Sequence, residues 1–196
     1  MSTACRLLFL LLLLAVTAAC SSKENVIIKS GELSYDRQQA VLRKKVAALL
    51  EKKSYRRAIE LMTDRNQPGS PPAGLEKEYL LAINGVIAAG EESLSRGDNA
   101  TAGQSFRLAL DSFPVQPSLR GKVRRNQSQI KKQLDISANR LLEQGFMEYR
   151  SGNLETAIRK WKEIIVFDAG HMEASKAIDT ATIQLRMLRN MEKPSQ

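Results

Sequence analysis

The residues that most often carry chemistry are few in this chain and stand far apart. His171 is the only histidine, and the two cysteines are Cys5 and Cys20. A metal site or a nucleophilic triad needs several such groups close together, so neither is expected. The adjacent carboxylates Glu91 and Glu92 would point in different directions on a helix, unlike a general acid and base pair. We therefore expect no enzymatic activity, no metal and no cofactor.

Cys20 has a different chemical context, because it ends a short apolar leader. Residues 7–16 are apolar, Arg6 precedes them and a polar stretch follows Cys20. This layout is typical of a cleavable export signal, and the apolar run is shorter than the roughly 20 residues that span a bilayer. The residues 17–20, Thr-Ala-Ala-Cys, resemble the lipobox of bacterial lipoproteins. The alternative is an ordinary secretory signal with a chance cysteine nearby.

The lipobox resemblance implies a processed and anchored protein. Residues 1–19 would be the lipoprotein signal peptide, Cys20 the acylated amino terminus that carries palmitate or a similar chain, and residues 20–35 a flexible tether. Ser21 and Ser22 follow the cysteine where no aspartate stands. By analogy with such lipoproteins, this sequence implies the outer membrane, with the protein facing the periplasm.

The charge of the mature chain limits its partners. It would keep 29 of the 30 Lys and Arg residues and all 21 acidic residues, a formal net charge of +8. Export excludes nucleic acid, which leaves phospholipid headgroups, lipopolysaccharide, peptidoglycan-linked polymers or an acidic protein as anionic partners. Two basic clusters either attract such a surface or are solvated helix faces. They are Arg43, Lys44, Lys45, Lys52, Lys53, Arg56 and Arg57, and Arg120, Lys122, Arg124, Arg125, Lys131 and Lys132.

Apolar spacing from residue 36 onward predicts an all-α domain over 36–196. Apolar residues recur every three to four positions, strand-like alternation does not persist, and Pro and Gly stand between the periodic segments. We expect helices at about 36–52, 55–65, 75–96, 99–112, 118–150, 154–167 and 171–191.

An internal repeat is the strongest pattern in this domain. Small and aromatic residues recur with a constant separation of 55 residues. Small residues allow two helices to approach closely and an aromatic ring fills the space beside them, so the pattern predicts helical hairpins. The first copy contains Gly90, Gly97, Ala102, Phe106, Ala109 and Pro114, and the second contains Gly145, Gly152, Ala157 and Trp161, with Ile164 and Ala169 at the last two steps.

This spacing resembles the tetratricopeptide repeat, a 34-residue helical hairpin. The stretch 83–116 matches all six signature steps and 138–171 matches four. A degenerate copy lies at 39–72, where Val46 and Lys53 replace both glycines. The excess residues, 117–137, keep a helical apolar stripe, so we expect a long inserted helix instead of a loose loop. It would either lengthen the first helix of the later repeat or form a separate helix kinked near Gly121, and a helix after the last repeat would cap the array.

The resemblance also implies a binding face and a class of function. Repeats of this family bind partners on a concave face, and the matching positions here are Asn139, Leu142, Phe146, Tyr149 and Arg150. The alternative is that the apolar members of this set pack on the inserted or last helix. We expect a membrane-anchored scaffold or adaptor that binds a protein partner in envelope or pilus assembly. A cell-wall or lipopolysaccharide binding module that uses the basic surfaces is the alternative function.

Overall fold

The computed structural model describes residues 36–63 and 67–191. Contacts divide the chain into two compact units, one ending at Lys45 and the other beginning at Val46. Of the first unit, residues 36–45 are described, and they are the start of a helix over 36–51. The predicted signal peptide, Cys20 and the tether lie outside the described residues.

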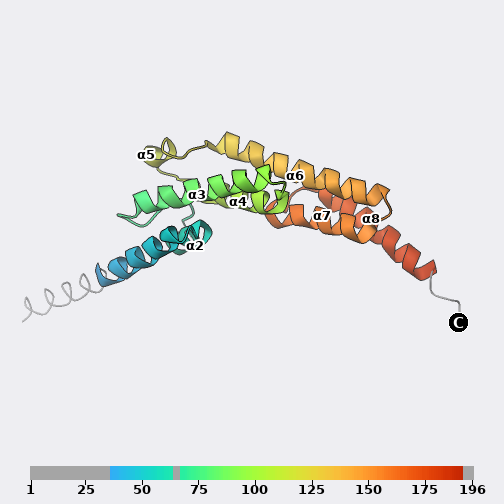
Figure 1. Ribbon diagram of the computed structural model, residues 1–196, viewed down its shortest axis with the longest axis horizontal. Helices are drawn as coiled ribbons and strands as arrows, with labels where there is room; N and C mark the ends of the chain where they lie inside the picture. Colours follow the sequence, from blue (N-terminus) through green and yellow to red (C-terminus); the bar gives the residue numbers. More distant parts are fainter. Residues whose placement is uncertain (1–35, 64–66, 192–196) are drawn as a thin grey trace, which may run out of the picture. The chain divides into compact units, whose positions relative to one another are not determined.

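The second unit contains all the labelled helices (Figure 1). In the part of the chain that the structure describes there is no strand, so the prediction of an all-helical domain is confirmed there. The helix boundaries agree with the predicted ranges within a few residues, with one exception. The helices are α2 (Tyr55–Met62), α3 (Glu76–Ser95), α4 (Asn99–Asp111), α5 (Pro117–Arg120), α6 (Gln127–Arg150), α7 (Leu154–Phe167) and α8 (Met172–Met191).

The exception is the helix predicted over 118–150. A lengthened helix over this range is wrong, and the chain follows the alternative, in which the helix is interrupted near Gly121. The chain forms only the short α5, leaves the helical conformation over 121–126, and begins α6 at Gln127. Asn126 starts α6 with a reciprocal capping box. The Asn126 side chain accepts from the Gln129 N–H, and the Gln129 side chain accepts from the Asn126 N–H. Such a box satisfies N–H groups that have no partner inside a helix, so it favours a new helix start here.

The non-helical segment is tied to α3. The Asn84 side chain accepts from the Arg124 N–H at 2.8 Å and donates to the Lys122 carbonyl at 3.3 Å. Glu91 pairs with both Arg124 and Arg125, each at 2.8 Å. These contacts give the backbone of the segment polar partners outside a helix, which explains why a continuous apolar stripe did not produce a continuous helix.

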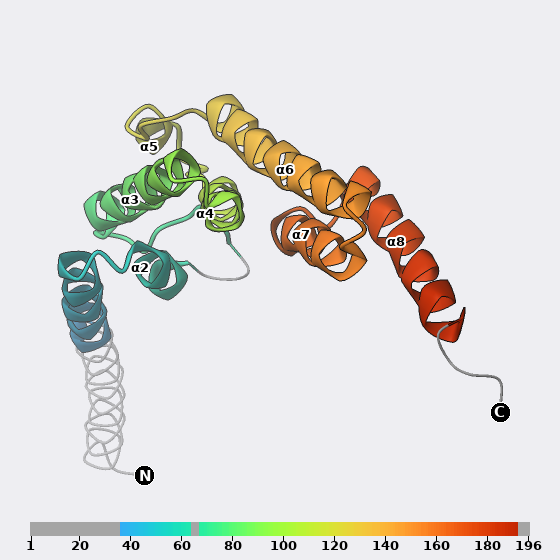
Figure 2. The ribbon, with the colours of Figure 1, turned by 45° about the vertical axis from the view of Figure 1, so that its right-hand side comes forward.

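Two antiparallel hairpins, α3 with α4 and α6 with α7, form the centre of the second unit (Figure 2). In addition, α2 packs on α3, α4 packs on α6 and α7, and α8 packs on α7. The buried Tyr79 of α3 donates from its hydroxyl to the Ser112 carbonyl at the end of α4, at 2.6 Å. Burial raises the pKa of Tyr79, so the hydroxyl stays protonated and keeps this bond.

Three turns between successive helices share one backbone geometry. Lys53, Gly97 and Gly152 adopt positive φ angles of 52°, 81° and 83°. In each turn the N–H of the next residue donates to the carbonyl five positions earlier, at 2.8 or 2.9 Å. This is a Schellman arrangement, in which a left-handed residue ends the helix and satisfies its last carbonyls. Lys53 adopts it although it has a Cβ, which makes that conformation unfavourable.

Where helices pack against each other, aromatic rings lie directly on the backbone of glycine residues. A Cβ added to any of four glycines would lie closer than 3.0 Å to ring atoms of its partner, so only a glycine fits there without displacing the ring. Two pairs join the helices of a hairpin and two join neighbouring hairpins. They are Gly90 with Phe106, Gly145 with Trp161, Gly85 with Tyr55, and Gly103 with Phe167.

The residues predicted to pack within the repeats occupy the core and the turns. Those outside the turns are buried, namely Gly90, Ala102, Phe106, Ala109, Pro114, Gly145, Ala157 and Trp161. Gly97 and Gly152 are the left-handed turn residues. The apolar stripe of the inserted segment is buried as well, at Leu119, Val123, Ile130, Leu134 and Ala138.

We predict that Gly145→Ala lowers the free energy of unfolding by about 1–3 kcal/mol, because the new methyl group would overlap the Trp161 indole. At an open helix position the same change would raise stability by about 1 kcal/mol, so the sign of the effect reports the close packing. Urea denaturation followed by circular dichroism measures it. Gly121→Ala, where a Cβ would have no atom within 4 Å, serves as the control and should be neutral. Equal losses in both variants would contradict the prediction.

We also predict a pH-dependent contribution from the cap of α4. The Asp98 carboxylate accepts from the Thr101 N–H at 3.1 Å, and hydrogen bonds from Thr101 hold the pKa of Asp98 below its ordinary value of 3.8. Asp98→Ala should lower the free energy of unfolding at neutral pH by about 1 kcal/mol. A lowered folded-state pKa gives stability that is present above the unfolded-state pKa and is lost as pH falls through the folded-state value.

The difference between Asp98→Ala and the parent should therefore shrink between neutral pH and about pH 2.5. Urea titrations at both pH values measure it. A difference that stays constant over that range would show that the carboxylate charge contributes nothing to the cap.

Candidate functional site

The predicted concave-face residues have different environments on α6. Asn139 and Arg150 are exposed, Phe146 and Tyr149 are half-buried, and Leu142 is buried. Leu142 contributes its carbonyl oxygen, which accepts from the Trp161 indole N–H at 3.1 Å. The structure therefore gathers Leu142, Phe146 and Tyr149 around Trp161 and leaves the two polar members on the surface.

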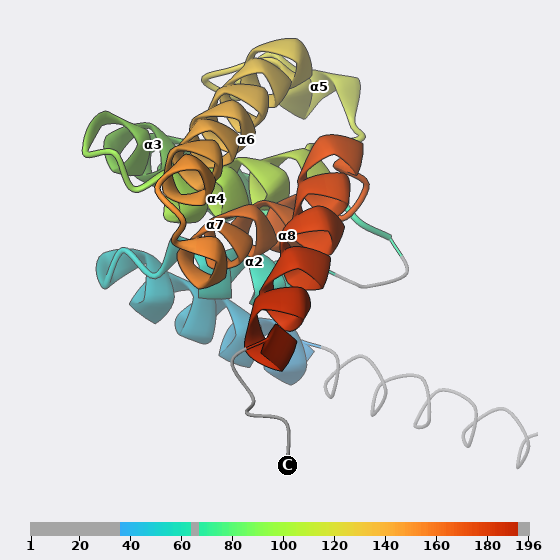
Figure 3. The same ribbon diagram turned by 90° about the vertical axis from the view of Figure 1, so that its right-hand side faces the viewer.

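A cleft of about 240 Å³ lies where α6, α7 and α8 meet, and we call it the aromatic cleft. Figure 3 shows α8 running beside α7 on this side of the unit. One wall is aromatic and the other is formed by short or charged side chains of α8. The lining residues are Phe146, Tyr149, Trp161, Glu173, Lys176, Ala177 and Thr180.

The aromatic wall has a defined ring geometry. The Phe146 and Trp161 rings meet edge to face, with centroids 5.3 Å apart and planes at 65°. The Tyr149 ring is tilted by 44° to the indole at 5.9 Å. Both separations fall in the range in which aromatic pairs attract each other. The Tyr149 hydroxyl also donates to the Gln184 side chain of α8 at 2.8 Å, which fixes the ring against that helix.

Exposed apolar side chains continue from the cleft along α8. Ile183 and Met187 are 53% and 60% exposed, and they follow the cleft residue Thr180 by three and seven positions, which places them on the same side of the helix. Met191, 74% exposed, follows at the next turn. Methionine is flexible and polarizable, so this strip suits a binding surface that adapts to its ligand.

The charged groups of the aromatic cleft lie at its edge. They are the exposed side chains of Glu173 and Lys176. Among the described residues, no group of three or more His, Cys, Asp or Glu side chains could hold a metal ion. His171 lies near the start of α8, where its Nδ1 accepts from the Ala174 N–H at 3.2 Å and caps the helix.

Several of the charged residues that the sequence analysis singled out form ion pairs in the structure. Glu91 pairs with the two arginines of the inserted segment, while its neighbour Glu92 pairs with Arg96 on the same helix. Lys131 of the second basic cluster pairs with Asp135. The second cluster is therefore partly neutralised by the fold.

Sequence reasoning missed the α8 side of the cleft. Lys176, Ala177 and Thr180 belong to no repeat step, and the signal that could have identified them is their position in the helix after the last repeat. That helix packs on α7 and supplies the side of the cleft that faces Phe146 and Tyr149. The prediction for Phe146 and Tyr149 came from the repeat register, and both residues line the cleft.

No protein-family model, curated protein or solved structure matches this chain. Within residues 36–63 and 67–191, none of the helices combines the length and the apolar character that crossing a membrane requires.

We predict that Trp161 reports on the aromatic cleft by fluorescence. It is the only tryptophan and is 1% exposed, so its emission should be that of a buried indole. Phe146→Ala removes the ring packed against the indole and should shift the emission to longer wavelength, while circular dichroism stays unchanged. Leu81→Ala, an exposed residue of α3, is the control and should leave the emission unaltered. An unshifted Phe146→Ala spectrum would contradict the ring contact.

Proposed function

We propose that this protein is a non-enzymatic scaffold or adaptor that binds a segment of another protein in the aromatic cleft. The observation that carries the proposal is the open cleft between α6 and α8, with an aromatic wall on one side and short or charged side chains on the other. Aromatic side chains that are fixed by packing are typical of the residues that contribute most to protein binding, because they lose little entropy when a partner binds.

The size of the cleft favours an anchoring side chain over a separate small molecule. Its 240 Å³ is below the roughly 300–1,000 Å³ of typical small-molecule pockets. An apolar or aromatic side chain of the partner would fill it, and the strip along Ile183 and Met187 would contact the adjoining residues of that partner. Glu173, Lys176 and Arg150 would supply polar contacts around this anchor and select for charge.

We further propose that the hairpins are tetratricopeptide-type units. Three turns with the same left-handed residue and hydrogen-bond pattern support this, as do the equivalent pairs Gly90 with Phe106 and Gly145 with Trp161. In such an array α6 and α8 would be successive first helices, and the groove between first helices is where partners of these repeats bind. The aromatic cleft occupies that position.

The cellular setting belongs to the same proposal. A lipid on Cys20 would anchor the protein to the outer membrane, facing the periplasm, and the partner would belong to an envelope or pilus assembly. This part rests on the leader sequence, the lipobox-like residues 17–20 and the two serines that follow.

The test fills the aromatic cleft without removing any packing residue. A photo-crosslinking amino acid at Arg150, an exposed residue that follows the cleft residue Tyr149 on α6, should yield a specific covalent adduct in living cells, and mass spectrometry identifies the partner. Thr180→Trp places a large ring in the cleft and should reduce this adduct about tenfold or more, because the anchor site is occupied. Circular dichroism should stay the same.

Gln127→Trp is the matched control, since Gln127 is an exposed polar residue at the start of α6 that lies outside the cleft lining. It should leave the adduct intact. Crosslinking at Arg150 that survives Thr180→Trp would refute the cleft as the binding site. The same probe placed at the exposed Arg96 should not capture this partner.

A further inference from the structure

A second cleft, of about 310 Å³, lies where α2, α3 and α4 meet, and we call it the basic cleft. It shares no residue with the aromatic cleft. The turn before α2 and the first turn of that helix supply its charged side, while α3 and α4 supply a neutral side. Its polar lining consists of Lys53, Ser54, Arg56, Arg57, Thr101 and Ser105, and Tyr55, Val86, Ala89 and Leu108 complete the lining.

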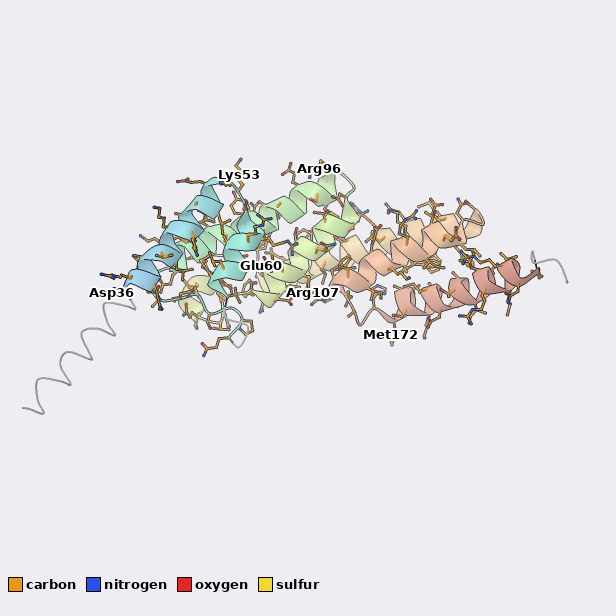
Figure 4. The ribbon with its side chains drawn as sticks, turned by 90° about the horizontal axis from the view of Figure 1, so that it is seen from below. Asp36, Lys53, Glu60, Arg96, Arg107 and Met172 are labelled. Carbon is orange, nitrogen blue, oxygen red and sulfur yellow. The ribbon has the colours of Figure 1, made fainter. Side chains whose placement is uncertain are left out.

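The lining has three positive charges and no negative charge. Across the part of the chain that the structure describes, ion pairs use other cations, including Arg96, Arg107, Lys131 and Arg189, and none involves Lys53, Arg56 or Arg57. The nearest acids in sequence are Glu51 and Glu60, the latter farther along α2 (Figure 4), and neither forms an ion pair with these three cations. The basic cleft therefore keeps an excess of positive charge.

The backbone at Lys53 gives an independent reason to assign this charge a role. Lys53 occupies the left-handed position that the two equivalent turns fill with glycine. A side chain in that conformation is disfavoured, and such an outlier points to a function for the side chain that is present. Lys53, whose backbone conformation is unfavourable, is one of the three cations of the cleft.

The neutral side of the cleft offers hydroxyl groups and carbon surface. Ser54 precedes α2 without using its side chain to cap the helix, so its hydroxyl can bind a ligand. Thr101 is exposed at the cleft. The Ser105 hydroxyl already donates to the Thr101 carbonyl at 2.9 Å, a hydrogen bond within α4. Val86, 4% exposed, and Leu108 form an apolar surface beside the hydroxyls.

We propose that the basic cleft binds a phosphate group on a short carbon skeleton. Two arginines present planar forks of N–H donors that match phosphate oxygens, and Lys53 adds a third charge, so a dianionic or diester phosphate suits the site better than a single carboxylate. The hydroxyls of Ser54 and Thr101 complete the donors. The apolar surface of Val86 and Leu108 accommodates the carbon skeleton.

The test is calorimetric titration of the purified full chain at low ionic strength with two soluble probes. Glycerol 3-phosphate represents phosphate monoesters, and glycerophosphoglycerol represents the headgroup of an anionic phospholipid. We expect at least one of them to bind with one site per chain, and the tighter one identifies the source of the ligand. Failure of both probes to bind would overturn this proposal. It would not affect the function proposed for the aromatic cleft.

Lys53→Gly is the most informative variant, because glycine suits the left-handed turn. It should unfold at an equal or higher temperature than the parent and bind the probe about tenfold more weakly. Arg56→Gln combined with Arg57→Gln should abolish measurable binding. Lys122→Gln combined with Lys132→Gln removes two exposed charges outside the cleft and should change the affinity less than about twofold. Equal weakening in this control would show only general attraction by net charge and would overturn the site.

Discussion

The packing of an aromatic ring against a glycine backbone is the contact on which the rest of this fold depends. It occurs inside both central hairpins and between neighbouring hairpins, at Gly85, Gly90, Gly103 and Gly145. A glycine in a helix costs about 1 kcal/mol of stability relative to alanine, and the chain accepts that cost at each site. The compensation is the burial of a whole ring against a backbone, which brings together helices that are far apart in sequence. The described helices have no metal ligand cluster to share that task.

The same contact generates the aromatic cleft. Trp161 is held between the Gly145 backbone and the Leu142 carbonyl, so its position is fixed by the core, and Phe146 and Tyr149 are fixed against it in turn. Opposite them α8 packs through small residues, with Ala174 and Ala181 fully buried. A helix that approaches through alanines carries too little side-chain volume to fill the space beside three rings. A rigid wall and an unfilled space therefore follow from the packing itself.

The sequence was sufficient for the hairpins because their determinants are local. Glycine, alanine and aromatic residues at regular steps predict which residues of two consecutive helices meet, and the turn residues follow from the same spacing. Contacts between hairpins were not predictable in this way, because Gly103 meets Phe167, a residue of another hairpin that no local spacing relates to it. An interruption near Gly121 was among the expectations, but the extent of the non-helical segment 121–126 was not predicted, because Asn84 and Glu91, which hold it, are distant in sequence. Of the candidate site, the repeat register identified the α6 residues and gave no information on α8.

Two sets of basic residues that look alike in the sequence differ in the structure, because one set forms ion pairs and the other does not. The arginines of the inserted segment looked like a binding surface in the sequence, yet Arg124 and Arg125 pair with Glu91 and hold the segment in place. Lys53, Arg56 and Arg57 looked the same in the sequence, but they line a cleft without a counter-ion, and one of them occupies a backbone conformation better suited to glycine. Crowding like charges brings a folded chain no stability of its own, so the unpaired set is consistent with the phosphate site proposed above, whereas the structure alone explains the paired set.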